Sequence, residues 1–126
     1  MRARVWGGRR LAASDQFYMT DKILVLSTAG SERDADNIAY ALLERRQAAC
    51  VNIVPKIASI YRWEGKVERS EEWLLLIKTT KSAFEQVRQT IQELHSYAVP
   101  ECISLPIENG STGYLEWLGE SVGSEG

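Results

Sequence analysis

Two long strand-like segments, which flank the dipeptide Glu64-Gly65, constrain the fold of this sequence most. In the segment before the dipeptide, Tyr61 and Trp63 fall on one face by the two-residue alternation of a β-strand. Gly65 can adopt a positive φ, and such a dipeptide between two strands is typical of a tight hairpin turn. Pro55 has no N–H to donate to a strand ladder and therefore indicates an edge strand or a bulge.

The length of this hairpin predicts that it extends beyond the body of the protein. Each arm of about 14 residues reaches about 45 Å at roughly 3.3 Å per residue. A compact chain of 126 residues has a diameter of only about 36 Å. The overhang would expose Tyr61, Trp63 and Trp73, and natural proteins usually cover such apolar edges. We therefore infer that other copies of the chain cover the hairpin; the alternative is a bent hairpin that folds onto its own sheet.

Two amphipathic helices are predicted on either side of this hairpin. The first follows Ser31, which can accept a hydrogen bond as the N-cap. The second spans residues 81–96, where Ser82 and Glu85 have the spacing of a capping box. Each helix carries one apolar stripe with the periodicity of a buried helix face. The stripes consist of Ala35, Ile38, Ala39 and Leu42 in the first helix and of Phe84, Val87, Ile91 and Leu94 in the second.

Two shorter strands complete the predicted domain. Residues 22–29 form an apolar run that we expect to be buried on both faces, residues 101–107 form another strand, and residues 112–118 form a short last helix that Ser111 or Thr112 would cap. The order β-α-β-β-α-β is the α+β, ferredoxin-like split βαβ arrangement. Right-handed crossovers then place the strands in the order 4-1-3-2, with both helices on one face. We expect one such domain over residues 19–120.

The segments outside this domain differ from it in composition. Residues 1–18 hold four Arg and one Asp, whereas the whole chain has a net charge of −2. Arg9-Arg10 is similar to the start of a twin-arginine signal, but Asp15 interrupts the apolar region that should follow. We therefore interpret residues 1–18 as a disordered extension and residues 121–126 as a flexible tail, and we expect a cytoplasmic protein.

Charge and apolar content argue against two classes of partner. A chain with a net charge of −2 does not have the excess of basic residues that a nucleic-acid-binding protein carries. Apolar runs such as residues 73–77 are too short to span a bilayer. RNA-recognition domains share the predicted topology, but they stack bases on aromatic residues of their central strands. Trp73 is the only aromatic residue in the corresponding strands here. We expect neither a nucleic acid nor a membrane as the partner.

The sequence contains no constellation that supports catalysis. No nucleophile-elbow, dinucleotide-binding or Walker-type motif is present. An acylphosphatase-like hydrolase would need a phosphate-cradling loop, for which only Arg33 beside Asp34 is available. Cys50 and Cys102 lie on opposite edges of the predicted sheet, about 14 Å apart at 4.8 Å per strand, which is too far for a disulfide. We expect two free thiols and no enzyme activity.

His95, the only histidine, is the one candidate metal ligand that the residue types suggest. We expect it in the last turn of the second helix, where the helix dipole favours a partial positive charge, and this role needs no ligand. The alternative is a metal site. A single chain with one His and two separated Cys cannot supply a closed zinc site, so Glu101 or a neighbouring subunit would have to contribute. Imidazole with a carboxylate or thiolate suits copper or zinc.

Five segments of the chain, taken in order and spacing, resemble the CutA divalent-cation-tolerance proteins. They are AACVNIVP, SIYRWEGKVE, IKTT, ELHSYAVPE and YLEWL, and the resemblance runs from about Lys22 to Leu118. It implies a homotrimer of ferredoxin-like subunits, a cytoplasmic role in tolerance to copper and other divalent metals, and copper(II) binding. The family is similar in architecture to the PII signalling proteins. The alternative function is therefore a signalling or scaffold trimer that binds a small anion through Lys78.

The resemblance also implies a ligand cleft between subunits. A metal-binding relative has a cysteine where this chain has Ser27, and a His-His pair where this chain has Leu94-His95, so only His95 carries over as a metal ligand. Ala98 stands where a polar residue is usual. A hydroxyl is a poor substitute for a thiolate toward a soft metal, so we expect weak copper(II) binding. The predicted cleft residues are Ser27, Cys50, Asn52, Tyr61, Trp63, Lys78, Tyr97, Glu101 and Trp117.

Overall fold

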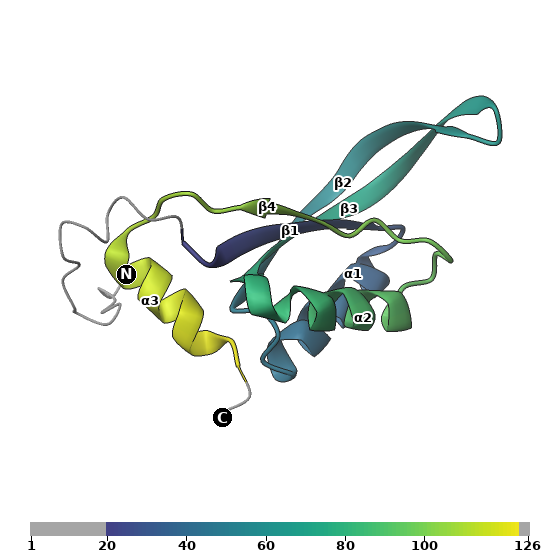
Figure 1. The fold of residues 1–126 in the computed structure, drawn as a ribbon. Helices are drawn as coiled ribbons and strands as arrows, with labels where there is room; N and C mark the ends of the chain where they lie inside the picture. Colours follow the sequence, from purple (N-terminus) through teal and green to yellow (C-terminus); the bar gives the residue numbers. More distant parts are fainter. Residues whose placement is uncertain (1–19, 124–126) are drawn as a thin grey trace.

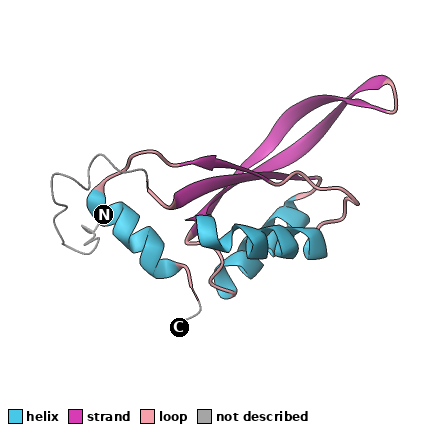
Figure 2. Cartoon of the chain, viewed as in Figure 1, coloured by secondary structure: helices cyan, strands magenta, loops and turns pink. Residues whose placement is uncertain are grey.

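The computed structural model describes residues 20–123 as one antiparallel sheet with two of the helices packed against one of its faces (Figures 1 and 2). The sheet has four strands in the order β2-β3-β1-β4, which confirms the predicted topology and the ferredoxin-like arrangement. The predicted extension, residues 1–18, lies outside the described residues. The elements are β1 (Lys22–Ala29), α1 (Glu32–Glu44), β2 (Cys50–Trp63), β3 (Lys66–Thr80), a 3₁₀ turn η2 (Lys81–Ala83), α2 (Phe84–Leu94), β4 (Ile103–Pro106) and α3 (Thr112–Ser121).

Strand β1 lies in the middle of the sheet but is fully buried on one face only. Its alternate residues Ile23, Val25, Ser27 and Ala29 are buried, and the residues between them are partly exposed. The expectation of burial on both faces was therefore wrong. The reason is that α1 and α2 both cover the same face of the sheet (Figure 1). The face without these helices is called the open face below.

The two helices begin in different ways. Ser31 caps α1 as predicted, because its Oγ accepts a hydrogen bond from the Asp34 N–H at 3.1 Å. The predicted capping box of Ser82 and Glu85 is wrong. The chain first forms η2, so α2 begins at Phe84 without a side-chain cap. Ser82 Oγ lies 3.2 Å from Thr80 Oγ1 instead of capping the helix.

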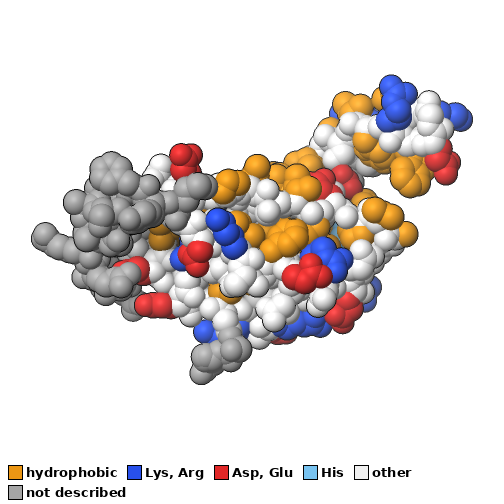
Figure 3. Space-filling view, in the orientation of Figure 1, with side chains coloured by type: hydrophobic (Ala, Val, Ile, Leu, Met, Phe, Trp, Pro, Cys, Tyr) orange, Lys and Arg blue, Asp and Glu red, His pale blue; other side chains and the backbone are white. Residues whose placement is uncertain are grey.

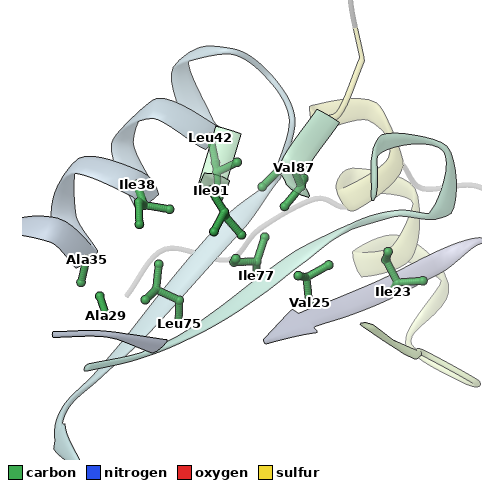
Figure 4. Close-up of a cluster of buried hydrophobic side chains, with 11 residues drawn as sticks. Ile23, Val25, Ala29, Ala35, Ile38, Leu42, Leu75, Ile77, Val87 and Ile91 are labelled. Atoms are coloured by element: carbon green, nitrogen blue, oxygen red, sulfur yellow. The ribbon is translucent and has the colours of Figure 1, made fainter. Parts of the chain in front are cut away.

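The core forms where the apolar stripes of α1 and α2 meet the covered face of the sheet (Figure 4). Burial of each large apolar side chain at the centre of this core stabilises the fold by about 1.5–3 kcal/mol through removal of apolar surface from water. The predicted stripes therefore point into the core, with Ala39, Phe84 and Leu94 only partly buried. The main contributors are Ile38 and Leu42 from α1, Val87 and Ile91 from α2, and Val25, Leu75 and Ile77 from the sheet.

The β2–β3 hairpin projects beyond the body, as its length predicts (Figure 1). Glu64 (φ 52°) and Gly65 (φ 80°) both have positive φ, the conformation of a hairpin turn that matches strand twist. Strand β1 ends where Ala29 pairs with Trp73, so the hairpin beyond this point has no third strand beside it. It does not fold back onto its own sheet. The predicted irregularity near Pro55 is a bulge between Val54 and Ile57 in the edge strand β2.

The C-terminal elements differ from the prediction in their limits. Strand β4 is shorter than predicted, and α3 continues to Ser121, past the predicted end at residue 118. The side chain of Arg46 holds the end of α3, because its Nε donates to the Gly123 carbonyl at 3.0 Å and a second nitrogen donates to the Glu120 carbonyl at 3.2 Å. Within residues 20–123, no helix has the length and apolar character needed to cross a membrane.

Candidate functional site

The open face of the sheet carries an apolar surface. Cross-strand pairing brings together side chains from three strands on this face, and Ile103 and Leu105 of β4 are about half exposed. Figure 3 shows hydrophobic side chains along the strands and again on the projecting hairpin. An exposed apolar surface of this kind marks a binding surface. The paired apolar residues are Leu24, Leu26, Leu74, Leu76, Ile103 and Leu105.

One group of predicted cleft residues lies at the end of the open face near α3. Cys50 pairs with Lys78 across the sheet, and its Sγ lies 3.7 Å from Asn52 Oδ1. The Lys78 ammonium lies 5.8 Å from the centre of the Tyr114 ring, close enough for a cation–π interaction. The Tyr114 and Trp117 rings are themselves 5.4 Å apart. Sequence reasoning missed Tyr114, although it lies one helical turn before Trp117.

A second group lies where the hairpin leaves the body. The Tyr97 hydroxyl donates a hydrogen bond to Glu72 Oε2 at 2.8 Å, and Glu72 is buried. The pKa of Tyr97 is raised to about 12. The largest cause is burial of the phenol, and the hydrogen bond to Glu72 and the negative charge of Glu72 add to it. Tyr97 therefore stays protonated and continues to donate. Gly30 makes room for this ring, because a Cβ there would lie 2.8 Å from the Tyr97 hydroxyl oxygen.

Glu72 was not among the predicted site residues. The signal that could have found it is the alternation of β3, because Glu72 falls on the same face as Leu74 and Leu76. A carboxylate among the apolar residues of one strand face indicates either that a polar group pairs with it or that the apolar surface ends there.

His95 connects this second group to β1. Helix α2 ends at Leu94, so His95 has an extended backbone (φ −80°, ψ 144°) and lies outside the last turn where we expected it. Its Nδ1 accepts a hydrogen bond from the Tyr97 N–H at 3.0 Å, and its Nε2 lies 2.6 Å from the Thr28 carbonyl oxygen. An amide nitrogen can only donate, so Nδ1 is unprotonated and Nε2 carries the proton. The ring is thus neutral, and both nitrogens are engaged.

The described conformation does not provide a metal site within one chain. Both ring nitrogens of His95 already have hydrogen-bond partners, so neither has a lone pair free for a metal. Within residues 20–123, no three His, Cys, Asp or Glu residues gather closely enough to hold a metal ion. Six residues of β3 separate Glu72 from Lys78, or about 20 Å at 3.3 Å per residue, so the two groups are also far apart.

The remaining predicted cleft residues are dispersed. Ser27 faces the core on the opposite side of the sheet from Lys78, and its buried Oγ has no hydrogen-bond partner in residues 20–123. Tyr61 and Trp63 are exposed on the hairpin, and Glu101 is exposed in the connection before β4. One subunit therefore supplies the parts of the predicted cleft without bringing them together.

Both cysteines are free thiols, as predicted. Cys50 begins β2, and Cys102 directly precedes β4 at the other edge of the sheet. Burial raises the pKa of the Cys102 thiol, and the nearby Arg88 only partly opposes this effect. The Cys102 thiol packs against the core and is not a nucleophile candidate.

Comparison with known proteins identifies relatives along nearly the whole domain. Residues 23–121 match the family described as CutA1 divalent ion tolerance protein. The divalent-cation tolerance protein CutA of Thermus thermophilus is 52% identical over 100 residues, which cover 79% of this chain and 97% of that protein. The solved structure of the Thermus thermophilus protein superposes with a TM-score of 0.80 at 51% identity, covering 81% of this chain and 99% of the other. The fold and its long hairpin are thus shared.

Two further relatives differ in the compartment that their descriptions name. The Archaeoglobus fulgidus protein is described as a periplasmic divalent cation tolerance protein; its structure has 40% identity and a TM-score of 0.79, covering 81% of this chain and 99% of the other. The Arabidopsis thaliana protein is described as chloroplastic; it is 46% identical over 100 residues, which cover 79% of this chain and 55% of that protein. None of these descriptions is that of an enzyme, in agreement with the predicted lack of catalysis.

Proposed function

This chain belongs to the CutA1 divalent ion tolerance protein family, and from that premise we propose that it acts in divalent-cation tolerance as a homotrimer with ligand clefts between its subunits. The main support is the separation of the cleft residues within one chain. The Lys78 group lies at one end of the open face, whereas Tyr61 and Trp63 project beyond the body on the hairpin. The hairpin of a neighbouring copy can bring such aromatic side chains to the Lys78 group.

The shapes of the two surfaces favour a ring over a symmetric dimer. The hairpin is a protrusion and the open face is a broad surface, so contact between them joins two different patches. Contacts between unlike patches are heterologous, and they generate closed rings when the rotation permits. Three is the number of subunits that the family resemblance implies.

The oligomeric state is tested by light scattering coupled to size-exclusion chromatography. A trimer of 14.2 kDa chains has a mass of about 43 kDa. Ile60→Ser at the hairpin tip should shift the mass toward 14.2 kDa, because it weakens the apolar contact of the projecting segment. Leu43→Ser, which changes an exposed apolar residue of α1, is the matched control and should leave the trimer intact. A wild-type protein that elutes as a monomer at micromolar concentration contradicts the proposal.

Copper(II) is the divalent ion that we propose as the ligand, bound weakly in the cleft between subunits. The residues of one chain do not fit a copper site as they stand, because both His95 nitrogens are engaged. Binding through His95 would therefore require its bond to the Tyr97 amide to break and further donors to come from a neighbour. This requirement supports weak binding. Ser27 cannot contribute as a ligand, because it is fully buried on the helix-covered face of the sheet.

Copper binding is tested by calorimetric titration of the wild type and of His95→Ala. The wild type should release a small heat with copper(II), and His95→Ala should release less. Gln92→Ala is the matched control, because Gln92 holds the same connection through a hydrogen bond to the Ala98 carbonyl at 3.1 Å but offers no imidazole. Equal heats in all three proteins would remove His95 from the site.

A second candidate function is that of a PII-like trimer that binds a small anion. The observation in favour is Lys78, whose ammonium forms no ion pair within residues 20–123 and lies beside the Tyr114 ring. Thermal-shift measurements with phosphate and with small carboxylates test this function. A stabilisation that Lys78→Met abolishes would support it, and the absence of any shift in the wild type would count against it.

We also propose a cytoplasmic location, which the described relatives leave open. Fractionation of cells that express the full chain tests it. Recovery of the protein in a periplasmic or organelle fraction would contradict this location.

A further inference from the structure

Glu72 is a buried carboxylate with few partners. It is only 8% exposed, and the Tyr97 hydroxyl is the one hydrogen-bond donor to it in residues 20–123. No lysine or arginine of those residues forms an ion pair with it. A buried carboxylate is usually paired with a cation or with several donors, because its desolvation is costly. One neutral phenol therefore leaves the charge of Glu72 incompletely compensated.

The surroundings of Glu72 suit an organic cation. Glu72 lies on the open face of β3, opposite Ile57 of β2 and next to the Tyr97 ring. Tyr61 lies further along the hairpin, because it pairs with Glu68, four residues before Glu72 in β3. A guanidinium or ammonium group binds a carboxylate by charge and contacts aromatic rings by their faces. The chemistry of this socket, defined as Glu72 and the Tyr97 ring that donates to it, fits a Lys or Arg side chain.

The projecting half of the hairpin carries such cations. Arg62, Lys66 and Arg69 are exposed, and none of them forms an ion pair within residues 20–123. Exposed apolar side chains lie among them: Ile60, Trp63 and Val67 are 60–66% exposed. Their chemistry complements a carboxylate on an apolar surface.

The tip of the same chain cannot enter this socket. Glu72 belongs to the same continuous ribbon, in which β2 and β3 pair residue by residue from Ile57↔Glu72 to Trp63↔Lys66. Lys66 is six residues from Glu72 along β3, or about 20 Å away at 3.3 Å per residue. Arg69 is only three residues from Glu72, but the alternation of β3 places it on the other face, so a second copy of the chain is the source of the cation that we infer.

We propose that the socket of Glu72 and Tyr97 receives one basic side chain, Arg62, Lys66 or Arg69, from the hairpin of a neighbouring copy. This inference rests on the proposed homotrimer and adds the contact that sets the orientation of each interface. Apolar contacts alone tolerate sliding, whereas a buried ion pair has one favourable position. The partner copy completes a site that one chain leaves unfinished.

Glu72→Gln is the variant that tests the socket. Glutamine keeps the shape and can still accept the Tyr97 hydrogen bond, but it carries no charge. Glu71→Gln is the matched control, because Glu71 is the next residue of the same strand, exposed and on the other face. Trimer dissociation on dilution, followed by sedimentation velocity, should shift by roughly 100-fold or more in concentration for Glu72→Gln. Glu71→Gln should shift it less than about threefold.

A charge exchange identifies the partner residue. Glu72→Arg should dissociate the trimer, and combination with Arg62→Glu, Lys66→Glu or Arg69→Glu should restore it in one of the three double variants. A Glu72→Gln protein that dissociates like Glu71→Gln, or failure of all three exchanges, would overturn the socket while the wild-type trimer stands. A monomeric wild type would instead refute the trimer itself, so the two failures are distinguishable.

Discussion

The two halves of the β2–β3 hairpin share one secondary structure but differ in their surroundings. In the basal half, β3 lies between β2 and β1, and Leu75 and Ile77 are fully buried under the helices. In the projecting half, the ribbon has no third strand, and every residue from Ile60 to Arg69 is exposed. The change occurs where Glu72 and the bulge after Val54 lie. Local strand pairing is therefore the same in both halves, and only neighbouring elements decide which half is buried.

This difference has a physical consequence for the projecting half. A two-stranded ribbon is only marginally stable in water, because it has little apolar surface to bury. The basal half gains its stability from the core of its own subunit. The projecting half must obtain apolar cover elsewhere, and this requirement supports assembly from identical copies.

The largest expected effect separates the two halves directly. Leu75→Ala removes a fully buried side chain from the core and should lower the free energy of unfolding by about 2–5 kcal/mol. Val67→Ala in the projecting half should lower it by less than about 1 kcal/mol, because the Val67 side chain is already 66% exposed and little apolar surface returns to water. Urea denaturation at one fixed protein concentration measures both. Equal losses at the two positions would remove the distinction between the halves.

The junction between the halves is tested by Gly30→Ala. The added Cβ would lie 2.8 Å from the Tyr97 hydroxyl oxygen, so the ring and its bond to Glu72 must shift. We expect a loss of about 1–3 kcal/mol in the free energy of unfolding, as for other overpacked sites. Tyr97→Phe removes the hydroxyl, so adding it to Gly30→Ala should recover part of the loss. A double variant that shows the full sum of both single losses would contradict this contact.

A stabilising substitution is expected in the basal half. Ser27 has a fully buried Oγ without a hydrogen-bond partner in residues 20–123. Ser27→Ala removes this unsatisfied group and should raise the free energy of unfolding by about 1 kcal/mol. Ser59→Ala, at a partly exposed position of the hairpin, is the control and should change it little. Destabilisation by Ser27→Ala would indicate that the hydroxyl has a partner.

The smallest expected effect is a pH dependence at the junction. Folding raises the pKa of Tyr97 to about 12 from the usual 10.0, so the folded state favours the protonated phenol. The resulting stability is present below pH 10 and is lost as the pH rises from 10 to 12. Solvent screening keeps the loss small, because Tyr97 is partly exposed. The urea midpoint of unfolding of the wild type should fall slightly between pH 10 and pH 12. This fall should be smaller in Tyr97→Phe, whereas Tyr40→Phe should show the same fall as the wild type.

The features that were predicted correctly depend on residues close together in the sequence, and most of those that were missed depend on contacts between distant residues. The Ser31 cap, the turn at Gly65 and the apolar stripes were predicted, because each depends on residues within a few positions of one another. The cap at Ser82 was not, because the chain turns through η2 before the helix begins. At the candidate site, Tyr97 and Lys78 come from the resemblance and stay predictions, and sequence reasoning did not single out their structural neighbours Glu72 and Tyr114.

By itself, the sequence determined the length of the hairpin, its turn and the alternation of its side chains, since these are properties of adjacent residues. Only the tertiary structure decided how His95 and Glu72 are used. His95 meets the Thr28 carbonyl across 67 positions of sequence, and Tyr97 meets Glu72 across 25. No local spacing encodes such contacts, because they form only after helix α2 packs on the sheet and turns its last residues toward β1.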